Sequence, residues 1–150
     1  RFLLHGKDQL VFEFSANKGS QFGTLKKVAS GGELSRIMLS IKAVLSRFKT
    51  LPTIIFDEID TGVSGEVSYK IGGVMHQMSQ YMQVITISHL PQVAAKGAHH
   101  FKVYKETINQ STCTQLKKLK PEDRILEIAQ MLRGEEISET AIQHAKELLN

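Results

Sequence analysis

Hydrophobic positions in the first third of the chain form one strand-like run and one helical stripe. The run at 9–16 is rich in β-forming residues and lies between turn-forming segments, which predicts a strand in a hairpin or small sheet. Residues 34–48 carry apolar side chains at helical spacing, namely Leu34, Ile37, Met38, Ile41, Leu45 and Phe48. We expect this face of the helix to be buried in the core.

The middle of the chain has the pattern of a β-α-β unit. Residues 53–56 and 83–88 are short apolar runs with β-branched side chains, as in buried parallel strands, and a helix is expected between them from about 64 to 82. A strand, a helix and a second strand in this order place the two strands parallel in one sheet. The prediction is an α/β fold with a parallel sheet core flanked by helices.

The last third predicts a small β-hairpin followed by two helices. After a short helix at 91–96, the runs at 99–106 and 111–119 alternate like two strands joined by a turn, and their outward faces should be polar. Pro121 opens a helix that Gly134 ends, and Ser138 can cap a last helix through Leu149. With no internal repeat or long linker, residues 1–150 are expected to form a single domain.

Composition and charge narrow the function classes only slightly. No stretch approaches the roughly 18 apolar residues of a membrane span, and the single Cys113 cannot form an intrachain disulfide, so we expect a cytoplasmic protein without a membrane partner. The net charge is +4, but the basic residues are scattered, which indicates nucleic acid only weakly. The chain begins at Arg1 without an initiator Met, and we expect it to be part of a longer protein.

Candidate chemistry lies where the two predicted parallel strands end. Asp57 and Glu58 follow the first strand, where Asp57 could hold Mg²⁺ through water and Glu58 could accept a proton from an attacking water. His89 follows the second strand, so an imidazole that could contact a phosphate would lie at the same edge. The alternative is that these acids simply end a strand and that this histidine is structural.

A glycine-rich helix start precedes the first of these strands. Ser30, Gly31, Gly32 and Glu33 enter the helical stripe, and a helix N-terminus with small residues lets an anion approach its free N–H groups. An ordinary serine N-cap would have the same sequence. The small residues of "IDTGVSGE" after the acids fit either a loop that passes close to another backbone or a plain turn.

The order of these segments resembles the ABC-type ATPases, in which a signature motif, a Walker B strand, a D-loop and an H-loop follow one another. The run "DEIDTGVSG" departs from the transporter members and resembles the SMC-like DNA-repair branch, and strings such as "KVASGGELSRIMLSIKAVL" and "ISHLPQVAAKGAHHFKVYKE" extend the similarity over nearly the whole chain. The resemblance implies the C-terminal lobe of an ATPase head, with a small β-hairpin added. It implies these roles: Ser30, Gly31, Gly32 and Glu33 for the signature, Asp57 and Glu58 for Walker B, Thr61, Gly62 and Ser64 within the D-loop, and His89 for the H-loop.

The resemblance also implies what this chain would need. It has no Walker A sequence, so ATP and Mg²⁺ would be bound together with an N-terminal lobe of the same protein, and the chain alone should be inactive. The signature would contact ATP held by a second, identical head, and the whole protein would act on DNA, associated with the nucleoid. The alternatives are an ABC transporter subunit and a non-catalytic interaction module.

Overall fold

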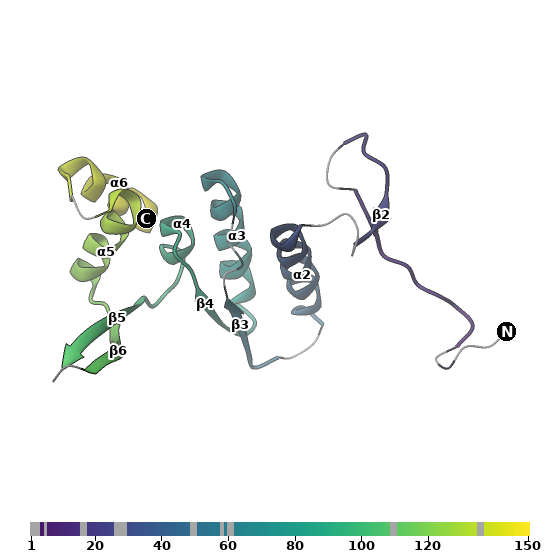
Figure 1. The fold of residues 1–150 in the computed structure, drawn as a ribbon, viewed down its shortest axis with the longest axis horizontal. Coiled ribbons are helices and arrows are strands. Elements are labelled where there is room, and N and C mark those ends of the chain that lie inside the picture. Colours follow the sequence, from purple (N-terminus) through teal and green to yellow (C-terminus); the bar gives the residue numbers. More distant parts are fainter. Residues whose placement is uncertain are drawn as a thin grey trace.

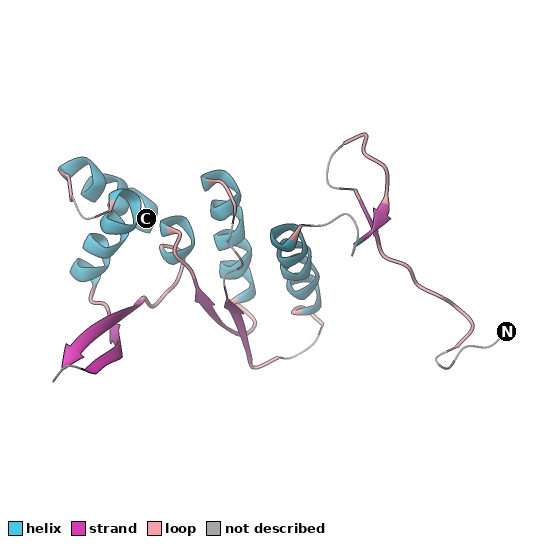
Figure 2. Cartoon of the chain, in the orientation of Figure 1, coloured by secondary structure: helices cyan, strands magenta, loops and turns pink. Residues whose placement is uncertain are grey.

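A computed structural model gives the fold and describes residues 4, 6–15, 18–25, 30–48, 51–57, 59, 62–108, 111–134 and 137–150. Near the N-terminus, strands β1 (Glu13–Phe14) and β2 (Gly23–Thr24) pair antiparallel, so the strand predicted at 9–16 is shorter than expected. The helices follow one another across the molecule (Figure 1), with short strands between them (Figure 2). The remaining elements are α2 (Gly31–Leu45), β3 (Thr53–Asp57), α3 (Gly65–Met78), β4 (Gln83–Ile87), α4 (Pro91–Ala94), β5 (Phe101–Ile108), β6 (Ser111–Lys118), α5 (Pro121–Arg133) and α6 (Glu139–Leu149).

The predicted β-α-β unit is confirmed. Strands β3 and β4 pair in parallel with Thr53 opposite Gln83 and Asp57 opposite Ile87, and α3 makes the crossover between them. Because the register runs without a shift from one end to the other, both strands finish at the same edge. The α/β fold predicted from the sequence is therefore confirmed at its centre.

Only one face of this parallel sheet is covered within the described residues. Ile54 and Phe56 are buried in a core with α3, whereas the intervening Ile55 is 63% exposed. Ile85 and Ile87 of β4 are 43% and 55% exposed. Parallel sheets are normally packed on both faces, so the second face, formed by Ile55, Ile85 and Ile87, is an apolar surface that lacks its usual cover.

Helices α3 and α4 approach each other closely at Gly72. A Cβ at this position would lie 3.2 Å from the backbone oxygen of Gln92 and 3.2 Å from Cγ of Lys96. Ser68, one turn earlier on α3, is fully buried; its Oγ donates to the backbone oxygen of Gly65 at 2.7 Å and lies 3.4 Å from Oε1 of Gln92. The small side chains of α3 thus allow α4 to lie directly against it.

The buried side of α2 differs from the predicted one. Leu39 is 3% exposed, and it lies with Ala43 and Ser46 on the side that packs toward α3. From the stripe predicted to be core, Leu34, Met38, Leu45 and Phe48 are instead exposed. The prediction was wrong for these four positions, whereas Ile37 and Ile41 of the same stripe are half-buried. Helix α2 packs toward α3 on the side of the small Ala43, and its broader apolar side has no comparable cover among the described residues.

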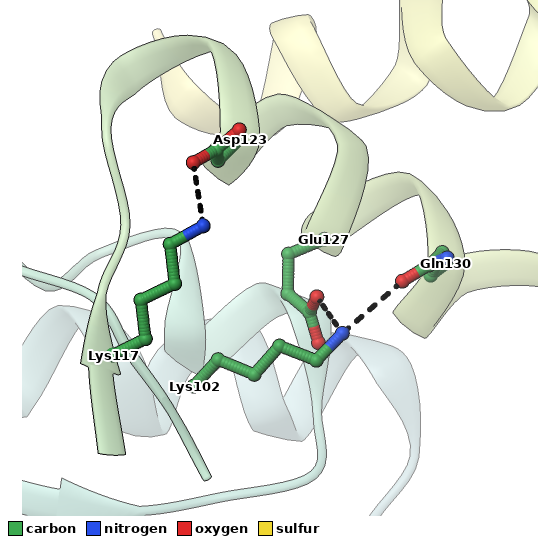
Figure 3. A network of polar contacts seen from close by, with 5 residues as sticks. All are labelled: Lys102, Lys117, Asp123, Glu127 and Gln130. Carbon is green, nitrogen blue, oxygen red and sulfur yellow. Dashed lines mark hydrogen bonds and ion pairs between the residues drawn. The ribbon is translucent and has the colours of Figure 1, made fainter. Parts of the chain in front are cut away.

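The β5–β6 hairpin is joined to α5 by polar contacts (Figure 3). Nζ of Lys102 pairs with Glu127 and lies 3.4 Å from Oε1 of Gln130, while Nζ of Lys117 lies 3.3 Å from Asp123. Lys102 and Lys117 are opposite each other in the strand register, so one face of the hairpin is directed at α5.

The opposite face of the hairpin carries exposed apolar residues among polar ones, so the prediction that the outward faces are polar is only partly correct. Phe101, Val103 and Leu116 are 50%, 64% and 66% exposed, and Val103 is paired with Leu116 in the register. Lys102 and Lys117 face the acids of α5, whereas the apolar residues share the outer face with Lys105 and Lys118.

Helices α5 and α6 form a second small core. Ile128 and Ala129 of α5 and Ala141 and Ala145 of α6 are all nearly or fully buried, and Ala95 beyond α4 joins them. Alanines at the crossing allow the two helices to pack closely. None of the helices in the described parts of the chain combines the length and apolar character that a membrane span requires.

The contact at Gly72 predicts a difference between two neighbouring glycines of α3. Gly73→Ala adds a Cβ in open space and should raise the free energy of unfolding by about 0.5–1 kcal/mol through helix propensity. Gly72→Ala should lack this gain, and Gly72→Val should cost roughly 1–3 kcal/mol because its side chain meets the backbone of α4. Denaturant unfolding of the variants measures this; equal effects at the two positions would contradict the close crossing.

His100, which precedes β5, predicts a loss of stability in acid. Burial, with a further contribution from the positive charge of Arg124, lowers the pKa of His100 below its ordinary 6.5, although Glu127 acts in the opposite direction. The unfolded chain therefore binds more protons than the folded chain, and the free energy of unfolding should fall as the pH decreases through about 6.5 toward the lower folded pKa. The unfolding free energy of His100→Gln, measured from pH 7.5 to 5.5, should decrease less than that of the parent; identical slopes would exclude His100 as the source.

Candidate functional site

The edge where β3 and β4 end brings together two of the residues singled out in the sequence. Asp57 is the last residue of β3 and lies opposite Ile87, and His89 follows two residues later; both side chains are exposed. In open α/β sheets, ligands bind beyond the carboxyl ends of the strands, which is the position of this edge. Glu58 and Thr61, which were predicted to act here, lie outside the described residues.

The turn that carries His89 is shaped by its neighbours. Ser88 Oγ accepts a hydrogen bond of 3.0 Å from the backbone N–H of Leu90, which turns the chain directly after β4. Helix α4 starts at Pro91, where a proline is favourable in a first helical turn, and Leu90 is its N-cap. His89 is therefore held between the end of a strand and the start of a one-turn helix.

The small-residue loop after the acids leads directly into α3. Gly62 has a φ of +70°, a conformation that glycine adopts without strain, and Ser64 is the extended N-cap residue of α3. No side-chain cap hydrogen bond is made by Ser64 to the described backbone. The loop thus keeps a serine hydroxyl at the start of the helix that crosses from β3 to β4.

The glycine-rich start of α2 forms a capping box. The backbone N–H of Glu33 donates to Ser30 Oγ at 3.3 Å, and the backbone N–H of Ser30 donates to Oε2 of Glu33 at 2.7 Å. The backbone of Ser30 has the largest effect on the pKa of Glu33 and lowers it, and the side chain of Ser30 lowers it further. The positive charge of Arg36 makes a smaller contribution in the same direction. The N-cap interpretation of Ser30 is therefore confirmed.

The capping box leaves some hydrogen-bond donors at the N-terminus of α2 available for a ligand. Ser30 Oγ accepts in the cap, and its own O–H proton can still be donated to an anion. The N–H groups of Gly31 and Gly32 are the first two of the helix and have no partner within it. A Cβ at Gly31 would meet none of the described residues within 4 Å, so they leave the surface open there. A helix cap and an anion site are compatible at these residues.

The donor set at the sheet edge would suit a magnesium ion only in part. Asp57 supplies a hard carboxylate oxygen, the type of ligand that Mg²⁺ prefers, usually together with waters and substrate phosphates. Among the described residues, no cluster of three or more His, Cys, Asp or Glu side chains is arranged to hold a metal. Asp57 fits a site completed by water and nucleotide rather than a cage made by the protein.

Arg124 of α5 contacts the end of α4, the helix that follows the turn of His89, and the sequence patterns did not single it out. It donates to the backbone oxygens of Ala95 and Gly97 at 2.8 and 2.5 Å, with a longer contact of 3.4 Å to Ala94. Burial lowers the pKa of Arg124, and its Nε is buried without a hydrogen-bond partner in the described structure. A basic residue in the first turn of a helix runs against the helix dipole, and this is the one feature that could have drawn attention to it.

Several bacterial DNA repair proteins have sequences similar to that of this chain. No protein-family model matches the chain. It is 42% identical over 146 residues to the DNA repair protein RecN of Haemophilus influenzae, which covers 97% of this chain and 26% of that protein. It is 44% identical to RecN of Halalkalibacterium halodurans over 99% of this chain, and 45% identical to RecN of Bacillus subtilis over 96%. The chain spans about a quarter of the length of these curated relatives.

A solved structure supports the fold. It is described as "Structural biochemistry of ATP-driven dimerization and DNA stimulated activation of SMC ATPases", and it matches 79% of this chain and 70% of its own with a TM-score of 0.56 and 19% identity. The fold implied by the resemblance to SMC-like ATPases is confirmed, and the transporter alternative is not favoured. The chain is a relative of the bacterial DNA repair protein RecN that shares the fold of the SMC ATPases.

Proposed function

We propose that this chain is the C-terminal lobe of an ATPase head that hydrolyses ATP to ADP and phosphate and couples this cycle to the repair of DNA double-strand breaks in the cytoplasm. The observation that carries the proposal is the parallel register of β3 and β4, which gives Asp57 and the turn of His89 a common edge. The similarity to RecN proteins supports the link to DNA repair.

The residues at this edge would divide the chemistry of hydrolysis. Glu58 would accept a proton from the water that attacks the γ-phosphorus, ADP would leave, and His89 would contact the γ-phosphate or that water. Asp57 would hold Mg²⁺ through water, and the ion when bound would neutralise charge on the β- and γ-phosphates. Thr61, Gly62 and Ser64 would form the D-loop beside them.

A second lobe is needed to complete the nucleotide site. The sequence lacks a Walker A loop, whose backbone and lysine cradle phosphates in P-loop enzymes. The uncovered sheet face formed by Ile55, Ile85 and Ile87 supports a partner lobe that packs against the parallel sheet. The N-terminal Walker A lobe of the same protein would supply both the loop and the cover.

A second head would complete the site from the other side. Ser30, Gly31 and Gly32 would meet the γ-phosphate of ATP bound to the opposite head, with Glu33 fixing the helix start. The open surface at Gly31 and the remaining proton of Ser30 support this assignment. ATP would then hold two identical heads together, and the assembled protein would bind DNA.

Substitution of Glu58 tests the proposed chemistry in an intact head that contains this chain. Glu58→Gln should lower the rate of ATP turnover by about 10² or more while ATP binding is kept, because an amide cannot act as the general base. Glu66→Gln, which changes an exposed acid of α3 paired with Lys70, is the matched control and should turn over normally. The chain alone should show no turnover and serves as the baseline. Normal hydrolysis by the Glu58 variant would exclude this residue as the base.

Substitution of Ser30 separates a cap from a dimer contact. Ser30→Ala should cost about 1 kcal/mol of stability, whereas Ser30→Asp keeps a good N-cap and should leave stability nearly unchanged. In an intact head with Glu58→Gln, Ser30→Asp should nevertheless abolish ATP-dependent association, because its carboxylate would repel the γ-phosphate. Sedimentation with ATP measures the association and nucleotide binding to single heads is the control; unaltered dimers would leave Ser30 with its capping role alone.

A further inference from the structure

We infer that Arg124 is a positioning residue for the turn of His89, acting through the one-turn helix α4. This inference rests on the proposed function, in which His89 contacts the γ-phosphate or the attacking water. It assigns a task to a side chain on a different helix from those that carry the candidate chemistry.

The contacts of Arg124 converge on the end of α4. Its terminal nitrogen Nη2 donates to the backbone oxygens of Ala95 and Gly97 and lies 3.4 Å from that of Ala94. These oxygens belong to the last residue of α4, its C-cap residue and the residue two positions later. Helix C-terminal carbonyls have no partner within the helix, and a cation there is favourable because of the helix dipole. Arg124 therefore completes an end that the short helix cannot satisfy by itself.

Backbone hydrogen bonds connect this end of α4 to the turn of His89. The N–H of Ala95 donates to Pro91 O at 2.9 Å, and the N–H of Ala94 donates to Leu90 O at 3.0 Å. Leu90 in turn donates to Ser88 Oγ at 3.0 Å, on the other side of His89. Since the helix is one turn long, a shift at its C-terminal end is transmitted to the residue directly before its start.

Helix α3 fixes the other side of α4. At Gly72 the backbone of α4 lies so close that a Cβ would be 3.2 Å from Gln92 O and 3.5 Å from Cα of Val93, and Ser68 Oγ is near the side chain of Gln92. A single helical turn is unstable in isolation, because nucleation costs more than one turn of hydrogen bonds returns. The position of α4 is thus set by α3 on one side and by Arg124 of α5 on the other.

The first part of the test uses the intact head that contains this chain and needs no nucleotide. In Arg124→Gln the amides of Ala94 and Ala95 should exchange with solvent about 10-fold faster or more, and the backbone resonances of His89 should shift. Arg133→Gln, which removes an exposed arginine from the last turn of the same helix, is the matched control and should leave both unchanged. Unchanged exchange and unchanged His89 resonances in Arg124→Gln would overturn the inference whatever the protein's activity.

The second part measures ATP hydrolysis by the intact head in a double-mutant cycle. Arg124→Gln should lower kcat roughly 10-fold, because His89 would be displaced from its position beside the reacting groups. The KM for ATP should change less than about twofold. With His89→Ala already present, Arg124→Gln should lower kcat no further, because its effect passes through His89. Arg124→Lys, which keeps a donor, should recover part of the loss.

An equal fall of kcat in both backgrounds would show that Arg124 only stabilises the fold and would overturn the inference. A normal kcat for Arg124→Gln would do the same. A wrong proposed function would be recognised by a different experiment, because the Glu58→Gln variant would then hydrolyse ATP at the normal rate. The amide exchange of α4 would still show whether Arg124 holds the turn of His89.

Discussion

The parallel pairing of β3 with β4 is the constraint on which the rest of this structure depends. Because Thr53 lies opposite Gln83 and Asp57 opposite Ile87, both strands end level, and the residues that follow them start from one edge. The crossover helix α3 must then pass over one face of the sheet, and it buries Ile54 and Phe56 there. A shift of one residue in this pairing would bury Ile55 instead and would move Asp57 away from the turn of His89.

Within the described residues, large apolar side chains are exposed in three separate places. They are the second sheet face around Ile55 and Ile85, the broad side of α2 with Met38, and the outer face of the hairpin with Val103. An isolated domain rarely leaves so many large apolar side chains exposed on neighbouring elements. The chain spans about a quarter of the length of its curated relatives, and these apolar surfaces support the proposal that an N-terminal lobe packs against it.

The sequence predicted elements well where local patterns decide them and failed where neighbours decide. The β-α-β unit and the hairpin follow from short apolar or alternating runs, and the helix N-cap follows from Ser30. The buried side of α2 could not be predicted from its apolar stripe, because the stripe does not show which side of the helix meets α3. The structure places the small Ala43 on that side.

The orientation of the hairpin depends on the acids of α5 that pair with Lys102 and Lys117, which is a contact between segments distant in sequence. At the site, Asp57 and His89 follow from strand ends, whereas Arg124 binds backbone oxygens, and only its place in the first turn of α5 marks it in the sequence.

The charge balance at the start of α2 explains why a glutamate can stand in a segment proposed to meet a phosphate. A free carboxylate there would repel the anion, but Oε2 of Glu33 accepts the backbone N–H of Ser30 at 2.7 Å, and Arg36 lies near enough to help lower its pKa. The carboxylate is thereby held back against its own helix. The groups that remain to face outward are the N–H donors of Gly31 and Gly32 and the proton of Ser30, all of which favour an anion. Glu33 thus fixes the backbone of the helix start, but it also adds a negative charge close to the proposed phosphate. For a phosphate to bind, the attraction of the helix dipole and of the two glycine N–H groups must be stronger than the repulsion by that charge.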